Sequence, residues 1–457
     1  MIEDGQIRQA FEACDDFVVR QVTCGAFTLF VYAIDGLVSG SAISDFVIRP
    51  ITGHLEGNSI LELYQNALQG QIYNCVAKPC KDLDDALTKL VNGFCVVLFP
   101  EAGAIAFETR TGEKRSISAP TVENTVKGPK DAFTETVRTN TSILRRHLRT
   151  PNLRLYGTMV GKHSKTYTVI AWIEGITDPE LVQRMKDRLS AIADQDFITS
   201  AAVEDGITGG RATPFPLLQY TERADKFAQG LLSGRVGVIV DGLPQGYLLP
   251  VDLGYLMYSP EDYSVDALSS SCIRVLRYGA LILSLLLPAF YIALAVFHQE
   301  MIPLPLLHSI IESRQSVPFS PVTEVLALLI AFELLQEAAI HLPQSIGQSV
   351  SIIGGIVVGS AAVEASLISP AALIVVSIAG ICGFALPNRD FAEGIRLTRF
   401  VLTVLGAFAG LFGVCTGGIG LLIHLSGVDS LGEAYLAPFA ELKPSGIIRT
   451  RLKGDRE

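Results

Sequence analysis

The pattern of hydrophobic and polar positions divides the 457-residue chain into two regions of different character. Residues 1–277 mix apolar and charged positions as soluble domains do, whereas residues 278–426 contain several long uncharged runs. Residues 278–297 are uncharged throughout, and about 20 such residues in a helix cross the hydrocarbon core of a bilayer. Residues 365–388 and 400–423 are uncharged over 24 residues each, and 346–363 is an uncharged run rich in Gly, Ser and Ala. The pattern therefore predicts an integral membrane protein.

The first region shows the alternation of β-hairpins, with helical stretches between them. One hairpin is predicted to turn near Cys24–Gly25 and a second around Glu101–Gly103. A third pair of strands flanks the polar turn in 153–175, and a helix capped by Asp178 follows it. We therefore predict an α/β N-terminal soluble region of two small α/β modules, followed by an all-α helical membrane domain. The expected boundaries are 1–120, 121–275, a membrane domain of four or five segments at 276–426, and a basic tail at 427–457.

Arginines and lysines indicate the orientation, because they concentrate on the cytoplasmic side of membrane helices. Arg274 and Arg277 precede the first apolar run, so we expect the N-terminal domain on the cytoplasmic side. The arginines of 389–399 and the basic tail favour the same side. If 400–425 crosses the membrane once, the arginines before it and the basic tail after it lie on opposite sides, so the side of the tail is left open.

Composition narrows the function further. The net charge of −10 and the lack of a basic patch with interleaved aromatics argue against nucleic acid as a partner. The eight cysteines form no CxxC pair, which favours reduced, small apolar side chains. The acidic N-terminus has no apolar core, so no cleavable signal peptide is expected.

No stretch argues for catalysis. GTMVGKHS at 157–164 resembles a phosphate loop, but its spacing is one residue short and His163 stands where Ser or Thr would ligate magnesium. The motif also falls in a hairpin, so a turn is the favoured interpretation. GITGGR at 206–211 lacks the Lys-Ser/Thr that would follow, and neither HExxH nor GxSxG occurs. We expect neither enzymatic activity nor a cofactor or metal.

A polar stripe marks the apolar stretch EVLALLIAFELLQEAAIHLP. Glu333, Glu337 and His341 follow a spacing of four residues, which places them on one helix face, and Gln336 and Gln344 extend the stripe. A carboxylate in the bilayer core costs about 2.5–3.5 kcal/mol on insertion scales, so these groups face protein or a water-filled cavity. The stripe either attracts cations along a permeation path or is satisfied by another helix or by the membrane interface.

The next apolar helix carries small residues on one face. They are Ser351, Gly355, Gly359 and Ala362, and Glu364 closes the helix near an interface. Small side chains let helices approach closely. This favours either tight packing within the chain or a symmetric ring of copies that lines a pore.

Long stretches of the chain resemble the GerA family of spore germination proteins, the A subunits of nutrient germinant receptors. The central one runs from AFELLQEAAIHLPQSIGQSVSIIGG through SAAVEASLISPAALIVVSIAGICGFALPN. Others are KGPKDAFTETVRTNTSILRRHLRTPNLR, YTERADKFAQGLLSGRVGVIVDGLP, MYSPEDY and YLAPFAEL. The resemblance extends from about residue 15 to residue 442.

The resemblance implies a protein of the spore inner membrane that works with a transporter-like B subunit and a lipoprotein C subunit. It implies a homo-oligomeric ring whose membrane helices form a cation channel. A sister branch, stage V sporulation protein AF, shares the motifs and acts as an accessory channel, and the sequence does not decide between the two.

The chain departs from the family pattern beside the acidic stripe. Gln336, Ala339 and His341 stand in a segment where relatives often carry two arginines. The glutamates therefore need another partner, or the stripe is more acidic, and His341 becomes a candidate pH-sensitive group. We predict a channel subunit of the germination apparatus, with a secondary transporter and a non-conducting membrane scaffold as alternatives.

Overall fold

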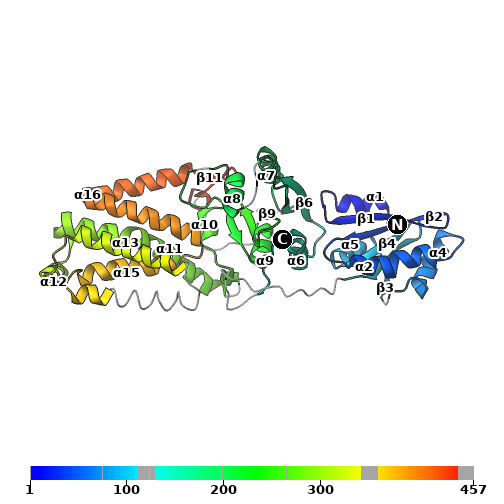
Figure 1. The fold of residues 1–457 in the computed structure, drawn as a ribbon, viewed down its shortest axis with the longest axis horizontal. Coiled ribbons are helices and arrows are strands. Elements are labelled where there is room, and N and C mark those ends of the chain that lie inside the picture. Colours follow the sequence, from blue (N-terminus) through cyan, green and yellow to red (C-terminus); the bar gives the residue numbers. More distant parts are fainter. Residues whose placement is uncertain are drawn as a thin grey trace. The chain divides into compact units, whose positions relative to one another are not determined.

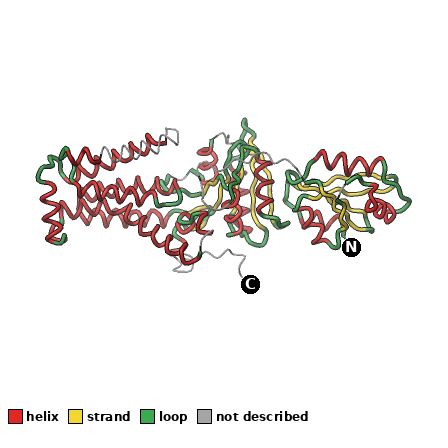
Figure 2. Tube along the Cα trace, turned by 90° about the horizontal axis from the view of Figure 1, so that it is seen from below, coloured by secondary structure: helices red, strands yellow, loops and turns green. Residues whose placement is uncertain are grey.

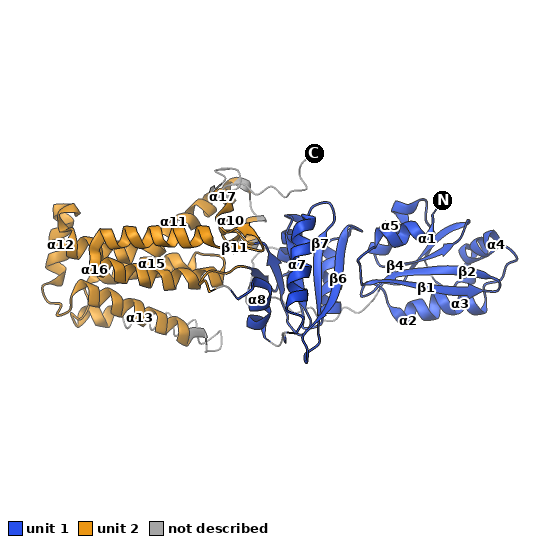
Figure 3. Ribbon diagram, turned by 90° about the horizontal axis from the view of Figure 1, so that it is seen from above, with its two compact units in different colours: residues 1–211, 218–250, 451–457 blue, residues 212–217, 251–450 orange. Residues whose placement is uncertain are grey.

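The computed structural model describes most of the chain (Figure 1). The described residues are 2–74, 76–110, 123, 129–194, 196, 199–210, 212–263, 266–340 and 359–440. They fall into two compact units, shown in blue and orange in Figure 3. The first comprises residues 1–211 and 218–250, and the second residues 212–217 and 251–450, each within its described parts. All ten longer strands belong to the first unit, and the second is mainly helical (Figure 2).

The first antiparallel sheet has helices on both faces. Its strand order is β1 (Phe17–Cys24), β2 (Phe27–Ile34), β4 (Phe94–Phe99), β5 (Gly103–Glu108) and β3 (Ala77–Pro79). One face packs on α1 (Asp4–Ala10) and α5 (Leu83–Val91). The other packs on α2 (Gly40–Ile43), η1 (Ser44–Ile48), α3 (Arg49–Gly53), α4 (Ile60–Asn66) and η2 (Ala67–Gln71). Neighbouring Val31 and Tyr32 belong to these two opposite cores, as the two-residue period of a strand requires.

The second sheet repeats the antiparallel arrangement. Its order is β6 (Leu153–Val160), β7 (Thr166–Ile173), β9 (Val236–Val240), β10 (Gly246–Leu249) and β8 (Gln219–Thr221). Its helices are α6 (Val137–His147), α7 (Pro179–Ala191), α8 (Ser200–Thr208) and α9 (Ala224–Leu232). Gly237 and Gly246 leave room for the Phe227 ring, since a Cβ at either would lie 2.2 or 2.6 Å from that ring. The predicted hairpins and the α7 cap at Asp178 are confirmed.

Within the first unit, buried ionic and backbone bonds join the two modules. Both carboxylate oxygens of Asp16, just before β1, accept from the guanidinium of Arg145 on α6, and Arg145 is only 1% exposed. The neighbouring Asp15 N–H donates to the Leu155 carbonyl of β6 at 2.9 Å. The Asp15 carboxylate accepts from Gly157 N at 2.5 Å. The residues before β1 therefore bond to the backbone of the edge strand of the second sheet.

The GTMVGKHS motif spans the end of β6 and the turn that leads to β7, so it lies in a hairpin as the sequence predicts. Asp196 Oδ1 accepts from the backbone N–H groups of His163 and Ser164 at 2.8 and 2.9 Å. The hydrogen bonds from Ser164 and His163 lower the pKa of this carboxyl group to about 2. The amides that would bind a phosphate are therefore already bonded to a carboxylate of the protein.

The second unit is a bundle of apolar helices with a small folded region where the chain enters and leaves it. Its elements are α10 (Leu253–Leu256), η3 (Pro260–Tyr263), α11 (Ala267–Ile292), η4 (Ala293–Phe297), η5 (Gln299–Met301), α12 (Leu304–Arg314), α13 (Pro321–Ile340), α15 (Pro370–Phe384), α16 (Arg389–Gly427), β11 (Asp429–Ser430), β12 (Glu433–Ala434) and α17 (Ala437–Ala440). In the described residues, Leu268–Phe297 and Arg389–Gly427 are long and apolar enough to cross a membrane, and Pro370–Phe384 is a shorter apolar helix.

Helices α13 and α15 run in the same direction. Near their starts, Glu324 Oε2 accepts from the Ser369 hydroxyl and N–H, and Ser369 is the N-cap of α15. Further along, the rings of Phe332 and Phe384 lie 6.0 Å apart. Gly380 permits this packing, because a Cβ there would lie 2.6 Å from the Phe332 ring.

The 39-residue α16 is folded back on itself at Gly410 (Figure 1). Gly410 has φ 60° and ψ −142°, a conformation essentially reserved for glycine. A Cβ on Gly417 would lie 2.8 Å from Leu405 Cδ1, although twelve residues of a straight helix span about 18 Å. Residues on either side of Gly410 therefore form two packed arms.

Candidate functional site

Glu333 of α13 is bound by two arginines of α16. Its Oε1 accepts from Arg399 Nη2 at 3.0 Å, and its Oε2 accepts from Arg396 Nη1 at 3.2 Å. Arg399 is 2% exposed, whereas the Glu333 side chain is 40% exposed. Each oxygen of one carboxylate thus pairs with a different guanidinium, and both arginines lie on the arm of α16 before Gly410.

Arg396 links this pair to two further polar side chains. Its Nη1 donates to Gln336, one turn along α13, and its Nη2 lies 3.5 Å from Glu393 on its own helix. We call Glu333, Gln336, Glu393, Arg396 and Arg399 the ion-pair cluster. The cluster contains two carboxylates and two guanidinium groups, so its formal charges cancel. A balanced, mutually bonded cluster is far cheaper to place among apolar helices than a bare carboxylate.

A cavity of about 260 Å³ opens beside the cluster. Glu333, Glu393, Arg396 and Arg399 line it together with the apolar side chains Leu329, Leu397 and Phe400. Such a volume has room for several waters, and the polar groups in its wall can bond them. The site therefore combines a space large enough for water with charges of both signs.

The cluster supplies a partner for Glu333, one of the two glutamates of the acidic stripe. Arg396 and Arg399 bind Glu333 from another helix. The two arginines lie 60 or more residues away along the chain, so the sequence around Glu333 does not indicate that they are its partners. Periodicity identified the carboxylate and could not identify its counter-charge.

The other predicted site residues are only partly brought together. Glu337 lies exposed on α13. Gly359 packs inside the unit, since a Cβ there would lie 3.4 Å from Leu373 of α15. Ala362 is half-buried and Glu364 is exposed. The remaining predicted residues, His341, Gln344, Ser351 and Gly355, lie outside the residues that the structure describes.

Glu324 is a buried polar residue outside the predicted polar stripe. Its side chain is fully buried, Arg314 Nη2 of α12 lies 3.1 Å from Oε1, and Ser369 donates to Oε2. The carboxylate thus accepts from the N-cap residue of α15 and ties α12 to α13. Its position in the first turn after Pro321 resembles an ordinary helix start, which is why the pattern of the stretch did not reveal it.

The arrangement supports electrostatic and packing roles. Within the described ranges, no group of three or more His, Cys, Asp or Glu side chains is placed to hold a metal ion. The chemistry available at the cluster is charge pairing and contact with water, which suits ion handling or helix registration in a membrane.

Comparison with known proteins gives one consistent result. The family profile described as Bacillus/Clostridium GerA spore germination protein matches residues 5–455. The membrane protein YfkQ of Bacillus subtilis (strain 168) is 35% identical over 438 residues, covering 94% of this chain and 84% of that protein. Spore germination protein KA of the same organism is 34% identical over 438 residues, covering 94% and 80%. Spore germination protein GerLA of Bacillus cereus is 31% identical over 438 residues, covering 95% and 89%.

Among solved structures, the chain aligns with the N-terminal domain of the A subunit of the Bacillus megaterium spore germinant receptor GerK3. The TM-score is 0.42 at 24% identity, over 54% of this chain and 92% of that chain. The family resemblance read from the sequence motifs is confirmed by the profile and by the relatives. The chain is a membrane protein and belongs to the GerA family of spore germination proteins, the germinant receptor A subunits.

Proposed function

We propose that this chain is the A subunit of a nutrient germinant receptor and that copies of it assemble into a cation channel that opens during germination. The observation that carries the channel role is the ion-pair cluster with its adjoining cavity. Ionisable groups within membrane helices are rare and mark ion or proton pathways when they face a hydrated space. Glu333, Arg396 and Arg399 are such groups, and they line a cavity that has room for water.

The depth of the cluster supports this role. Arg399 precedes Gly410 by eleven residues of helix, which corresponds to about 16 Å. Gly410 packs against Phe297 at the end of the long helix α11–η4. If that end lies at one face of a hydrocarbon core about 30 Å thick, the cluster lies near its middle. A charge at that depth has the greatest effect on an ion that crosses.

The partners and location follow from the family. In the proposed receptor the chain works with a transporter-like B subunit, which binds the nutrient, and a lipoprotein C subunit. It resides in the spore inner membrane with its N-terminal unit on the spore core side. Arg274 and Arg277 at the start of α11 support that orientation, because arginines concentrate on the cytoplasmic side.

A second candidate function is a membrane scaffold that conducts nothing. Two observations favour it. The charges of the cluster cancel within one chain, and Gly359 of the small-residue face packs against Leu373 of the same chain. Both features also serve ordinary helix packing. The scaffold and the channel differ in one measurable respect, which is the passage of cations.

The test uses spores that carry Glu333→Gln or Gly359→Leu at the parental protein level. Gly359→Leu is expected to slow germinant-triggered cation release, because a Cβ at this position would already touch Leu373 and the rest of the leucine side chain needs further room. Glu333→Gln is expected to change the rate, because it removes the charge that holds Arg399. Glu312→Gln on exposed α12 is the matched control and is expected to behave like the parent. Unchanged release in both test variants would refute the pore assignment.

A further inference from the structure

We propose that α16 crosses the membrane twice, as a hairpin with its tip at Gly410, so that the chain enters and leaves the membrane on the same side. By length and composition alone, Arg389–Gly427 counts as a single long span. A single span would place its two ends on opposite faces. The contacts of the described residues contradict that arrangement at three independent places.

The first place is the interior of the hairpin. Leu402 and Val414 belong to one small core together with Ala289 and Ala293 of the preceding long helix. Gly406 allows this contact, because a Cβ there would lie 3.1 Å from Val414 Cγ2 and 3.0 Å from the Ala289 carbonyl. The two arms therefore pack on each other and on α11 along their lengths.

The second place is the open end of the hairpin. Phe391, in the first turn of α16, and Leu425, in its last, belong to the same buried core around Phe215. His424 also bonds to Thr213 at 3.0 Å. The beginning and the end of α16 therefore lie beside the same short segment, residues 212–217.

The third place joins the chain before its first membrane helix to the chain after its last. Ser430 Oγ accepts from Val251 N at 2.9 Å, and the Tyr435 carbonyl accepts from Leu253 N at 2.9 Å. Ser430 and Tyr435 are buried at 1% and 0% exposure. Residues that follow α16 are thus hydrogen-bonded to residues that precede α11. The number of crossings between them is even.

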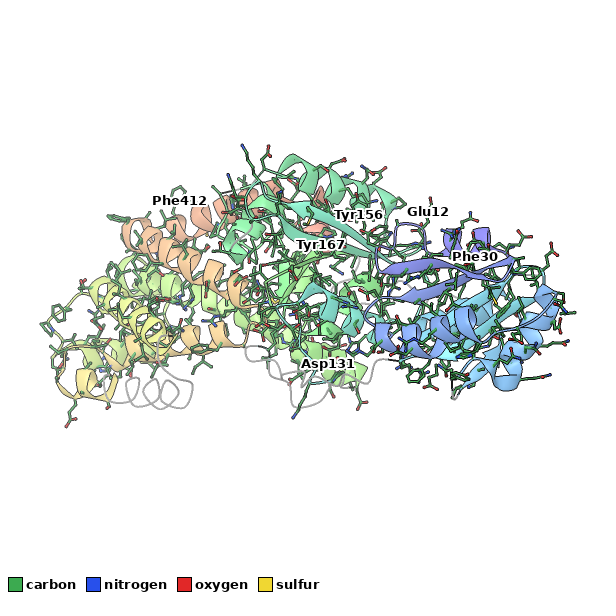
Figure 4. All side chains as sticks on the ribbon, turned by 45° about the vertical axis from the view of Figure 1, so that its right-hand side comes forward. Glu12, Phe30, Asp131, Tyr156, Tyr167 and Phe412 are labelled. Atoms are coloured by element: carbon green, nitrogen blue, oxygen red, sulfur yellow. The ribbon has the colours of Figure 1, made fainter. Side chains whose placement is uncertain are left out.

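The two arms are long enough and apolar enough for this role. Residues 389–409 and 411–427 correspond to about 31 and 26 Å of helix, close to the thickness of a hydrocarbon core. Large apolar side chains are exposed on both arms, such as Phe408 at 81% and Phe412 at 74%. Figure 4 shows Phe412 on the outer surface of its helix. Exposed phenylalanines at these positions suit contact with lipid.

The tip lies level with the far end of α11. A Cβ at Gly410 would meet Phe297 Cβ at 2.9 Å and the His298 ring at 3.0 Å. Because α11 is long enough to cross the membrane, a hairpin that reaches its end crosses as well. Arg389, in the first turn of α16, then lies on the same side as the end of α16, so the positive charge before this run and a basic tail after it no longer conflict.

Sidedness is tested on the full chain with a short epitope at the N-terminus, at the C-terminus or after Glu300. Sealed inside-out vesicles are treated with a protease that removes exposed epitopes. The N- and C-terminal epitopes are expected to be removed together, and the epitope after Glu300, between α11 and α12, is expected to be protected. Protection of the C-terminal epitope while the N-terminal one is lost would overturn the proposal.

The hairpin itself is tested by disulfide trapping in a Cys415→Ser background, which removes the exposed thiol on α16. The pair Leu405→Cys with Gly417→Cys is expected to form a disulfide on oxidation, detected by mass spectrometry of proteolytic fragments. The pair Phe408→Cys with Gly420→Cys has the same twelve-residue separation, but Phe408 points outward and a Cβ at Gly420 meets nothing within 4 Å. A straight helix would hold either pair about 18 Å apart, beyond disulfide reach. Failure of the first pair, or equal linking of both, would overturn the hairpin.

Discussion

Removing Glu333 or Arg399 from the ion-pair cluster should have unequal effects on stability. Glu333→Gln leaves the 2%-exposed guanidinium of Arg399 buried without an anion. Arg399→Met removes the buried charge and leaves Glu333, which is 40% exposed, still bonded to Arg396. Leaving one partner of a buried ion pair unpaired is costly, whereas replacing the buried charge by an apolar side chain of similar size is not.

The expected magnitudes follow from those exposures. Breaking a buried pair costs about 3–5 kcal/mol, and we expect the lower end for Glu333→Gln because Gln still offers an oxygen to Arg399. Arg399→Met loses hydrogen bonds worth about 1 kcal/mol. The double variant should resemble Arg399→Met, because it contains no unpaired buried arginine. The coupling energy between the two sites is therefore about 3 kcal/mol in magnitude.

The assay is unfolding of the purified chain in mixed micelles by added dodecyl sulfate, followed by helical circular dichroism. Glu312→Gln is the control, since it removes an equivalent charge from an exposed position of α12. Equal losses for Glu333→Gln and Arg399→Met, or a double variant whose loss equals the sum of both, would refute the pairing as the source of the stability.

Three further predictions concern other parts of the chain. Gly410→Ala should destabilise the helical unit by about 1–3 kcal/mol in the same assay, because Gly410 has a positive φ that alanine adopts only with strain. Gly418→Ala is the control and should have little effect, since a Cβ there meets nothing within 4 Å. Equal effects of the two substitutions would contradict a strained turn at Gly410. Arg145→Met should lower the unfolding free energy of the first unit by about 3 kcal/mol, because it leaves the largely buried Asp16 carboxylate without its cation. Urea unfolding followed by the fluorescence of Trp172 measures this loss. An unchanged urea midpoint would show that the Asp16–Arg145 pair does not stabilise the contact between the two modules. Asp196→Asn should lower the Tm of that unit near neutral pH. The pKa of Asp196 is depressed from 3.8 to about 2, so its contribution to stability is present above about pH 4 and is lost as the pH falls toward 2. The Tm difference between parent and variant should therefore narrow between about pH 4 and about pH 2. A difference that stays constant over that range would contradict the prediction.

The fold of the first unit could be predicted because its signals are local. The turn after Cys24 and the turn at Gly103 lie between strands that pair with their immediate neighbours in sequence. Asp178 precedes a proline at the first turn of α7, so the cap is visible in the sequence as well. The way in which strands of distant hairpins join into two sheets depends on core packing. The alternation of apolar and polar residues does not predict it.

The site was predicted only in part, because its contacts are distant along the chain. Glu333 stood out as a charge in an apolar helix, but its arginines lie on α16. Gly410 looks like the other glycines of its helix, and only its packing against Phe297 distinguishes it. The long uncharged runs gave the correct class of protein, whereas the fold-back in α16 depends on the backbone conformation of one residue, Gly410.

Cation flux through the purified chain in liposomes tests the central claim most directly, with the chain alone and together with its B and C subunits and nutrient. The channel account predicts potassium efflux above that of protein-free liposomes, reduced by Gly359→Leu and unchanged by Glu312→Gln. Folded, oligomeric protein that passes no cations in either setting would contradict the account and leave the chain a membrane scaffold.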